Sequence, residues 1–175
     1  MPLHFNWDGP VEFLFDSVGG KMSCPHRRDL PWNDYDRMIY MLQLMPPYYV
    51  SYKSGKSAVC YIGQGSNALR VISHNETWFH KVAIILENFK GFYVWGCQPR
   101  QRNSLNAYKK VEGDALELFK DTFGERPLFN QRGGSWSEHT YSDEVDRDTR
   151  RIFSLDEKKG YSVAIRSLAT RKVAG

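Results

Sequence analysis

The sequence has few cysteines and no long apolar run. Only three of its 175 residues are cysteine, and Cys24, Cys60 and Cys97 are far apart. An odd number at wide spacing argues against a disulfide framework and a zinc site of the CxxC type, and favours a reducing, cytoplasmic setting. No stretch is long and apolar enough to span a membrane, so we expect no membrane partner. The first residues are acidic and aromatic, which argues against a secretory signal.

Internal repeats, low-complexity tracts and a strong net charge are also lacking. The formal net charge is +4, and Lys and Arg exceed Asp and Glu by 11 to 7 within residues 46–130. A bound polyanion is compatible with that excess, although on charge alone an ordinary solvated surface is the better explanation. The length allows one domain with a hydrophobic core. We divide the chain into an N-terminal arm or helical segment (1–46), a central module (47–131) and a C-terminal extension (132–175).

The hydrophobic pattern predicts a mixture of helices and strands. The predicted helices cover 34–44, 68–74 and 104–123, the last of which ends at Gly124. The predicted strands cover 48–53, 58–64, 91–97 and 161–165, and the first two are joined as a hairpin. The short apolar run 78–88 fits either a helix or a strand.

Tyr61-Ile62-Gly63 is the most informative motif, because it ends the second strand of the predicted hairpin. If the hairpin loop consists of residues 54–56, Lys53 pairs with Ser57 and Tyr49 lies opposite Tyr61. Two phenols on one sheet face can handle protons when a cation or metal lowers their pKa from about 10. The alternative is a cross-strand pair that only packs.

Two candidates for phosphate chemistry follow on the next predicted helix. Arg70 and His74 have i, i+4 spacing and therefore share one helical face. An arginine fork suits phosphate oxygens, and a nearby imidazole can donate a hydrogen bond or move a proton. The alternative is a surface charge at Arg70 and a cation at the C-terminal end of the helix at His74.

The predicted helix 104–123 contains the candidate carboxylate. Glu112 lies on its apolar stripe, four residues after Tyr108 and four before Leu116. A carboxylate on a core-facing stripe is unfavourable unless it forms a salt bridge or binds a metal ion. We therefore choose Glu112 as the candidate metal ligand, with Glu117, on the solvated side, as the second choice.

The order of these residues resembles that of the GIY-YIG nuclease family over about residues 47–131. In the first motif, Pro47 and Tyr48 stand in place of the family's glycine and isoleucine. From the residues alone, the Asn130 amide can bond either to backbone or to substrate. The matching residues are, in chain order, Tyr48-Tyr49-Val50 (first motif), Tyr61-Ile62-Gly63 (second motif), Arg70, His74, Glu112 and the closing Pro127 and Asn130.

The resemblance implies an α/β (α+β) module in which helices flank a three-stranded antiparallel sheet. It also implies an endonuclease that hydrolyses DNA phosphodiester bonds with one Mg²⁺ or Mn²⁺ ion held by Glu112. By the same resemblance, Tyr49 activates water with help from Tyr61 and His74, and Arg70 steadies the scissile phosphate. Whether Tyr48 or Tyr49 is the first-motif tyrosine depends on the hairpin register.

In its small size, the chain is more similar to the restriction members of the family than to its repair or homing members. We therefore expect a type II restriction endonuclease acting on double-stranded DNA, for which one site per chain suggests a homodimer. The alternatives are a non-catalytic nucleic-acid-binding module and a homing, repair or effector nuclease of the same fold. Arginine and glutamine suit guanine and adenine edges, although polar loop composition explains them equally. The predicted DNA contacts are Gly63, Gln64, Arg100, Arg102 and Arg132.

Overall fold

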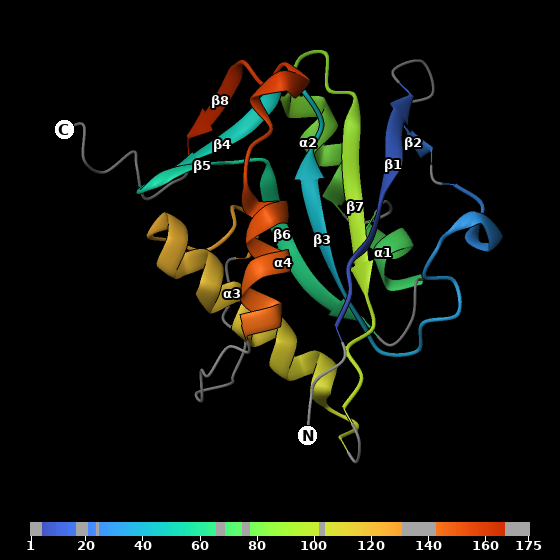
Figure 1. The fold of residues 1–175 in the computed structure, drawn as a ribbon. Helices are drawn as coiled ribbons and strands as arrows, with labels where there is room; N and C mark the ends of the chain where they lie inside the picture. The colour runs from blue at the N-terminus through green and yellow to red at the C-terminus, as the bar shows by residue number, and fades with distance from the viewer. Residues whose placement is uncertain are drawn as a thin grey trace.

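The computed structural model (Figure 1) describes residues 5–16, 21–23, 25–65, 69–74, 78–101, 104–130 and 143–166. Its strands are β1 (Asp8–Asp16), β2 (Lys21–Ser23), β3 (Met38–Leu44), β4 (Tyr48–Tyr52), β5 (Gly55–Ser57), β6 (Val59–Gly65), β7 (Gly91–Cys97) and β8 (Val163–Arg166). Its helices are α1 (Leu69–His74), α2 (His80–Ile85), α3 (Ala107–Phe123) and α4 (Asp143–Phe153), with short 3-10 turns η1 (Arg27–Asp29) and η3 (Glu157–Lys159).

Two sheets organise the described chain. The larger sheet has the strand order β2-β1-β7-β3-β6, and each neighbouring pair is antiparallel. The smaller sheet has the order β5-β4-β8, in which β4 and β8 are parallel. The predicted mixture of helices and strands is therefore confirmed. The expected three-stranded antiparallel sheet is wrong, because the antiparallel sheet has five strands and a second, mixed sheet is added to it.

The central strand β3 explains the largest error in the predicted elements. All seven of its residues are buried, so its sequence lacks the apolar–polar alternation of a half-exposed strand. A continuous apolar run of this length fits a buried helix equally well, which is why the predicted helix over 34–44 is wrong. β3 pairs with β6 on one side and with β7 on the other.

The two faces of the larger sheet are covered by different helices. Gln43 of β3 donates a hydrogen bond to the Ile152 carbonyl of α4, at 2.6 Å. Leu44, which points to the opposite face, pairs with Phe92, and the Phe92 ring lies 4.6 Å from that of Phe79, just before α2. In Figure 1, α4 accordingly lies on one side of β3 and α2 on the other.

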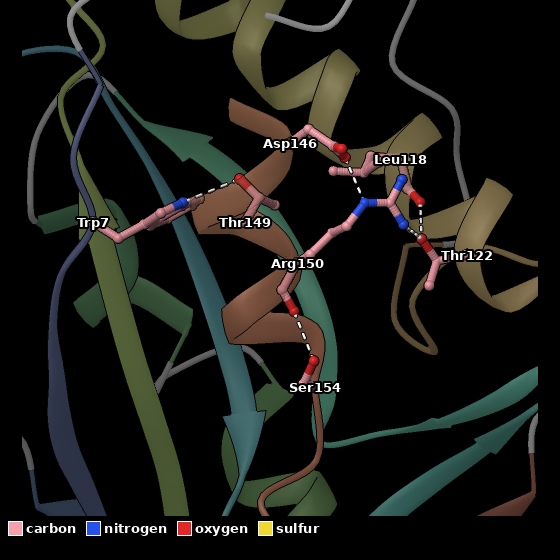
Figure 2. Close-up of polar contacts among 7 residues, drawn as sticks. All are labelled: Trp7, Leu118, Thr122, Asp146, Thr149, Arg150 and Ser154. Atoms are coloured by element: carbon pink, nitrogen blue, oxygen red, sulfur yellow. Dashed lines mark hydrogen bonds and ion pairs between the residues drawn. The ribbon is translucent and has the colours of Figure 1, made fainter. Parts of the chain in front are cut away.

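Helix α4 was not expected from the sequence, in which its region has the composition of a charged tail. Its polar groups attach it to distant parts of the chain (Figure 2). The Trp7 indole donates to the Thr149 hydroxyl at 3.2 Å, and Arg150 donates to the Thr122 hydroxyl of α3 at 2.9 Å. Arg150 also forms an ion pair with Asp146 one turn earlier, at 2.5 Å. These contacts hold α4 beside α3 and the N-terminal strand.

Several other predictions agree closely with the structure. β4, β6, β7, α1 and α3 lie within three residues of their predicted bounds. Gly124 ends α3 in the left-handed conformation, with φ at 75°, and its N–H donates to the Lys120 carbonyl at 2.7 Å. The three predicted segments are interleaved, since β1 and β3 share a sheet with β6 and β7, and β8 pairs with β4. None of the helices in the described ranges is both long and apolar enough to cross a membrane.

Candidate active site

Two tyrosines on neighbouring strands form the centre of the candidate site. In the β3–β6 pairing, Tyr40 is opposite Gly63 and Leu42 is opposite Tyr61. Tyr40 and Tyr61 are therefore diagonal neighbours that project from the same face of the sheet. Their ring centroids are 6.0 Å apart, and each phenol shifts the pKa of the other. Tyr40 is fully buried, whereas Tyr61 keeps some exposure.

Tyr49 lies elsewhere, and its predicted pairing with Tyr61 is wrong. β4 turns back through a two-residue loop onto the short strand β5, and the chain then bends into β6, which pairs with β3. Tyr49 is opposite Ala164 of β8, with the Lys56 ammonium 5.4 Å from its ring centroid. Tyr48, the alternative, is buried and donates to the Glu87 carbonyl. The predicted register paired β4 with β6, whereas β6 pairs with β3. Local sequence does not specify which strand is the partner.

Tyr40 is the site residue that the sequence interpretation missed. It lies within 34–44, which the hydrophobic pattern predicts to be a helix, so the pattern does not place it beside the second motif. A signal was available, because Met38-Ile39-Tyr40 keeps the isoleucine and tyrosine of the first motif of the resembled family. The structure pairs this segment directly with Gly63-Gln64-Gly65.

His74 joins the tyrosine pair from the end of α1. Its Nε2 atom lies 2.5 Å from the Tyr40 hydroxyl oxygen, and its Nδ1 accepts a hydrogen bond of 2.9 Å from the Trp78 indole. Its ring centroid is 5.3 Å from that of Tyr61. Burial and, secondly, the positive charge of Arg70 lower the pKa of His74 to about 4. The imidazole is therefore neutral at pH 7.

The two phenols are also neutral at pH 7. Burial raises the pKa of Tyr40 well above its ordinary value, and the neighbouring Tyr61 raises it further. Burial likewise raises the pKa of Tyr61, although its hydrogen bond with Tyr40 opposes that rise. The positive charge of Arg70 lowers both values, and the negative charge of Glu112 raises both. These opposing effects indicate that Arg70 and Glu112 both lie near the phenol pair.

Arg70 supplies the positive charge at the exposed side of this cluster. It lies on α1 one turn before His74, as its spacing predicted, and its side chain is exposed. An exposed guanidinium keeps its hydrogen-bond donors accessible to an anionic ligand. The structure thus brings together the predicted residues Tyr61, Arg70 and His74, with Tyr40 in place of Tyr49.

Glu112 is the unusual carboxylate of α3, as predicted. It is half-buried, and it makes no hydrogen bond or ion pair with any other residue in the described ranges. Burial raises its pKa to about 7. Glu117, the second choice, forms ion pairs with Lys120 at 3.1 Å and with Arg126 at 3.0 Å. Although burial raises the pKa of Glu117, these two cations outweigh that effect and lower it.

The carboxylate of Glu112 fits a hard divalent cation whose other ligands are water and substrate oxygens. Within the described ranges, no group of three or more His, Cys, Asp and Glu side chains could form a closed metal cage. Mg²⁺ is commonly held by one or two carboxylates, with water and substrate phosphate oxygens completing its octahedron. A single half-buried carboxylate that pairs with no described residue meets that requirement, whereas a structural zinc site needs more nitrogen or sulfur ligands.

Asn130 bonds to the backbone, which was one of the two options left open by the sequence. Its Nδ2 donates to the Ile62 carbonyl at 2.6 Å, and its Oδ1 accepts from the Ile62 N–H at 2.9 Å. The neighbouring Phe129 N–H donates to the Cys60 carbonyl at 2.9 Å. β6 is the edge strand of the sheet, so these bonds satisfy its outer side. Asn130 therefore fixes the strand that contains Tyr61.

Gly63 is buried beneath the tyrosine pair. A Cβ atom at this position would lie 2.5 Å from Cε1 of Tyr61 and 2.9 Å from the Tyr40 hydroxyl. Both distances are too short for non-bonded atoms, so only glycine leaves room for the two rings. The predicted DNA contact by Gly63 stays a prediction, and the structure adds a second reason for glycine there.

Of the other predicted DNA contacts, Gln64 pairs with Ile39 near the start of β3, and Arg100 lies beside Arg37 and Tyr108. Gln64 is half-buried, and its Oε1 atom is buried without a hydrogen-bond partner. Arg100 is exposed, and its guanidinium donates from Nε and Nη2 to Oε1 of Gln98, at 3.1 and 2.7 Å. Arg102 and Arg132 lie outside the described residues.

A polar surface pocket of about 390 Å³ lies beside Arg100. Arg37, just before β3, and Tyr108, one turn before Glu112, also line it. Asp36 accepts a hydrogen bond from Gln98 at the same place. The pocket lies at the start of β3 and α3, the elements that contain Tyr40 and Glu112, and its lining includes Asp36 as well as Arg37 and Arg100.

Comparison with known proteins adds no assignment to this geometry. The chain matches no protein-family model, no curated protein and no solved structure at a significant level.

Proposed function

We propose that this protein is a metal-dependent endonuclease that hydrolyses DNA phosphodiester bonds. One observation carries the proposal: Tyr61 and the hydrogen-bonded pair Tyr40–His74 lie together beside one sheet face, near an exposed arginine and a half-buried carboxylate that pairs with no described residue. Structural clusters of this size normally pair their charges, whereas here Glu112 has no ion-pair partner in the described ranges. The combination supports a site that awaits a cation and an anionic substrate.

The resemblance to the GIY-YIG family is better explained with Tyr40 as the first tyrosine. Met38-Ile39-Tyr40 keeps two of the three residues of the first motif, and it lies on the strand adjacent to Tyr61-Ile62-Gly63. Tyr49 has neither property. The resemblance then extends from residue 38 rather than from residue 47. We propose Tyr40 for the role that the sequence interpretation assigned to Tyr49.

Each residue then has a distinct role in hydrolysis. Water attacks phosphorus, its oxygen forms the new P–O bond, and the bond to the leaving sugar oxygen breaks. Tyr40 would first lose its own proton to solvent by way of the more exposed Tyr61, and the resulting phenolate would accept the proton of the attacking water. The nearby guanidinium of Arg70 favours that phenolate and donates hydrogen bonds to the phosphate oxygens. Glu112 would hold Mg²⁺, which supplies positive charge to the phosphate and the leaving oxygen.

Double-stranded DNA is the substrate that we propose. Arg37 and Arg100 line the pocket at the start of β3 and α3, and we propose that they add to the positive charge that Arg70 supplies. Cations along such a surface bind phosphates, and arginine also pairs with guanine edges. A restriction enzyme must cut both strands, so we further propose that two copies act together on one duplex. A stable monomer on a cleavable duplex would contradict this last step.

A plasmid cleavage assay with Mg²⁺ tests the function. We expect Tyr40→Phe, Arg70→Ala and Glu112→Gln each to lower the cleavage rate by about a hundredfold or more, because each removes a group that acts on the reacting atoms. Urea unfolding of each variant separates lost chemistry from lost folding.

Tyr49→Phe is the matched control, because it removes one phenol oxygen far from the cluster. We expect it to cleave at the wild-type rate. Loss of cleavage in Tyr49→Phe but not in Tyr40→Phe would instead support the assignment made from sequence. DNA binding without nicking, unchanged by Glu112→Gln, would support the non-catalytic binding module.

A further inference from the structure

The His74 imidazole has a polar partner at each ring nitrogen. Nδ1 lies 2.9 Å from Nε1 of Trp78, and Nε2 lies 2.5 Å from the Tyr40 hydroxyl oxygen. An indole N–H can donate a hydrogen bond but cannot accept one. Nδ1 must therefore present a lone pair to Trp78, because an N–H there would face another N–H.

The lone pair at Nδ1 determines the tautomer of the ring. A neutral imidazole has one N–H and one lone pair, so the proton is on Nε2. Burial keeps the ring neutral by lowering its pKa to about 4. The Nε2–H group consequently donates to the Tyr40 oxygen, and the hydroxyl proton of Tyr40 points away from His74.

The indole of Trp78 is itself held in place by aromatic neighbours. Its ring centroid is 4.7 Å from those of Phe79 and Phe129 and 5.6 Å from that of Tyr61. It therefore presents its N–H to His74 from a packed position. The two hydrogen bonds therefore run in one direction, from Trp78 to His74 and from His74 to Tyr40.

We propose that Trp78 is a positioning residue that fixes His74 in the Nε2–H tautomer, so that His74 donates a hydrogen bond to Tyr40 and does not accept its proton. An N–H donor next to a phenol oxygen stabilises the phenolate when the phenol loses its proton. In the opposite tautomer, Nε2 would hold the Tyr40 proton in place. The catalytic meaning of this arrangement rests on the proposed nuclease function, whereas the tautomer itself does not.

Nuclear magnetic resonance of the full chain with ¹⁵N-labelled histidine tests the tautomer directly. Two-bond ¹H–¹⁵N correlations distinguish Nε2–H from Nδ1–H, and the His74 signals are those lost in His74→Gln. We expect Nε2–H in the wild type at pH 7.5, which is well above the pKa of His74. An Nδ1–H signal from His74 in the wild type would overturn the proposal without any variant.

Trp78→Phe removes the indole N–H and keeps an aromatic ring. We expect the Nδ1–H tautomer of His74 to become populated in this variant. Cleavage should fall by about tenfold with KM little changed, which is the effect of one lost hydrogen bond in the transition state. Trp95→Phe is the matched control, since it removes another indole hydrogen bond of 2.9 Å, to Gln43, and should leave both readings unchanged.

The two readouts separate this inference from the proposed function. An unchanged His74 tautomer in folded Trp78→Phe would overturn the role of Trp78. A change of tautomer in a protein whose wild type never cleaves DNA would support the hydrogen-bond assignment and refute the nuclease function.

Discussion

Neutralising Glu112 should stabilise the protein at alkaline pH. Burial raises the pKa of this carboxyl from 4.5 to about 7, and no cation in the described ranges is paired with it. Below pH 4.5 the group is protonated in both the folded and the unfolded chain, so it contributes no difference. Between pH 4.5 and 7 the unfolded chain ionises this carboxyl while the folded chain keeps it protonated, so stability falls across this window and levels off above pH 7, where the folded chain holds a desolvated charge. The wild type therefore loses up to about 3 kcal/mol that Glu112→Gln keeps.

Urea unfolding at pH 4 and at pH 8, in buffer with a chelator, measures this difference. We expect Glu112→Gln to match the wild type at pH 4 and to be more stable by about 1–3 kcal/mol at pH 8, with an unchanged m-value. Mg²⁺ at about a hundred times its dissociation constant should add about 2.7 kcal/mol to the wild type at pH 8 and little to the variant.

Glu117→Gln is the matched control with the opposite sign. Lys120 and Arg126 lower the pKa of Glu117, so its charge stabilises the fold above the unfolded pKa, and that stability is lost as the pH falls. This variant should be less stable than the wild type at pH 8. An equal effect of Glu112→Gln at both pH values, or destabilisation at pH 8, would refute the conclusion that Glu112 is a desolvated carboxylate that no described cation neutralises.

Two further substitutions test the support of the tyrosine pair. Gly63→Ala places a methyl group 2.5 Å from Tyr61, so we expect a loss of about 1–3 kcal/mol in urea unfolding and a fall in cleavage; unchanged cleavage would mean that the rings need not keep their positions. Asn130→Ala leaves the Ile62 N–H and carbonyl without partners, which should cost about 1–3 kcal/mol and speed hydrogen exchange at Ile62. Lost cleavage with unchanged stability would show that Asn130 acts on substrate instead.

Of the pair Tyr40 and Tyr61, the sequence pattern identified only Tyr61. Tyr61 could be recognised because its motif is contiguous and follows a turn. Tyr40 could not, because β3 is buried on both faces and its apolar run fits a helix as well as a strand. The register of an assumed hairpin then selected Tyr49, on the strand expected to precede Tyr61. The true partner of β6 is separated from it by β4 and β5, which belong to another sheet.

The role of Trp78, like that of Tyr40, is not revealed by the sequence alone. Its indole meets His74 across residues 75–77, and nothing in that spacing specifies an indole N–H directed at Nδ1. The partners of Asn130 depend in the same way on the edge position of β6. Hydrogen-bond direction is set by the packing around each group, and packing is a property of the assembled fold.

What the sequence determined by itself is the set of local features: the long helix that ends at Gly124, the shared face of Arg70 and His74, and the anomalous position of Glu112 on an apolar stripe. Helical periodicity and chain stereochemistry are local, so these could be read without a fold. Only the tertiary structure decided which strand lies beside β6, and hence which tyrosine meets Tyr61. Strand pairing joins segments far apart in the chain, and the burial of the pair as a whole selects the partner.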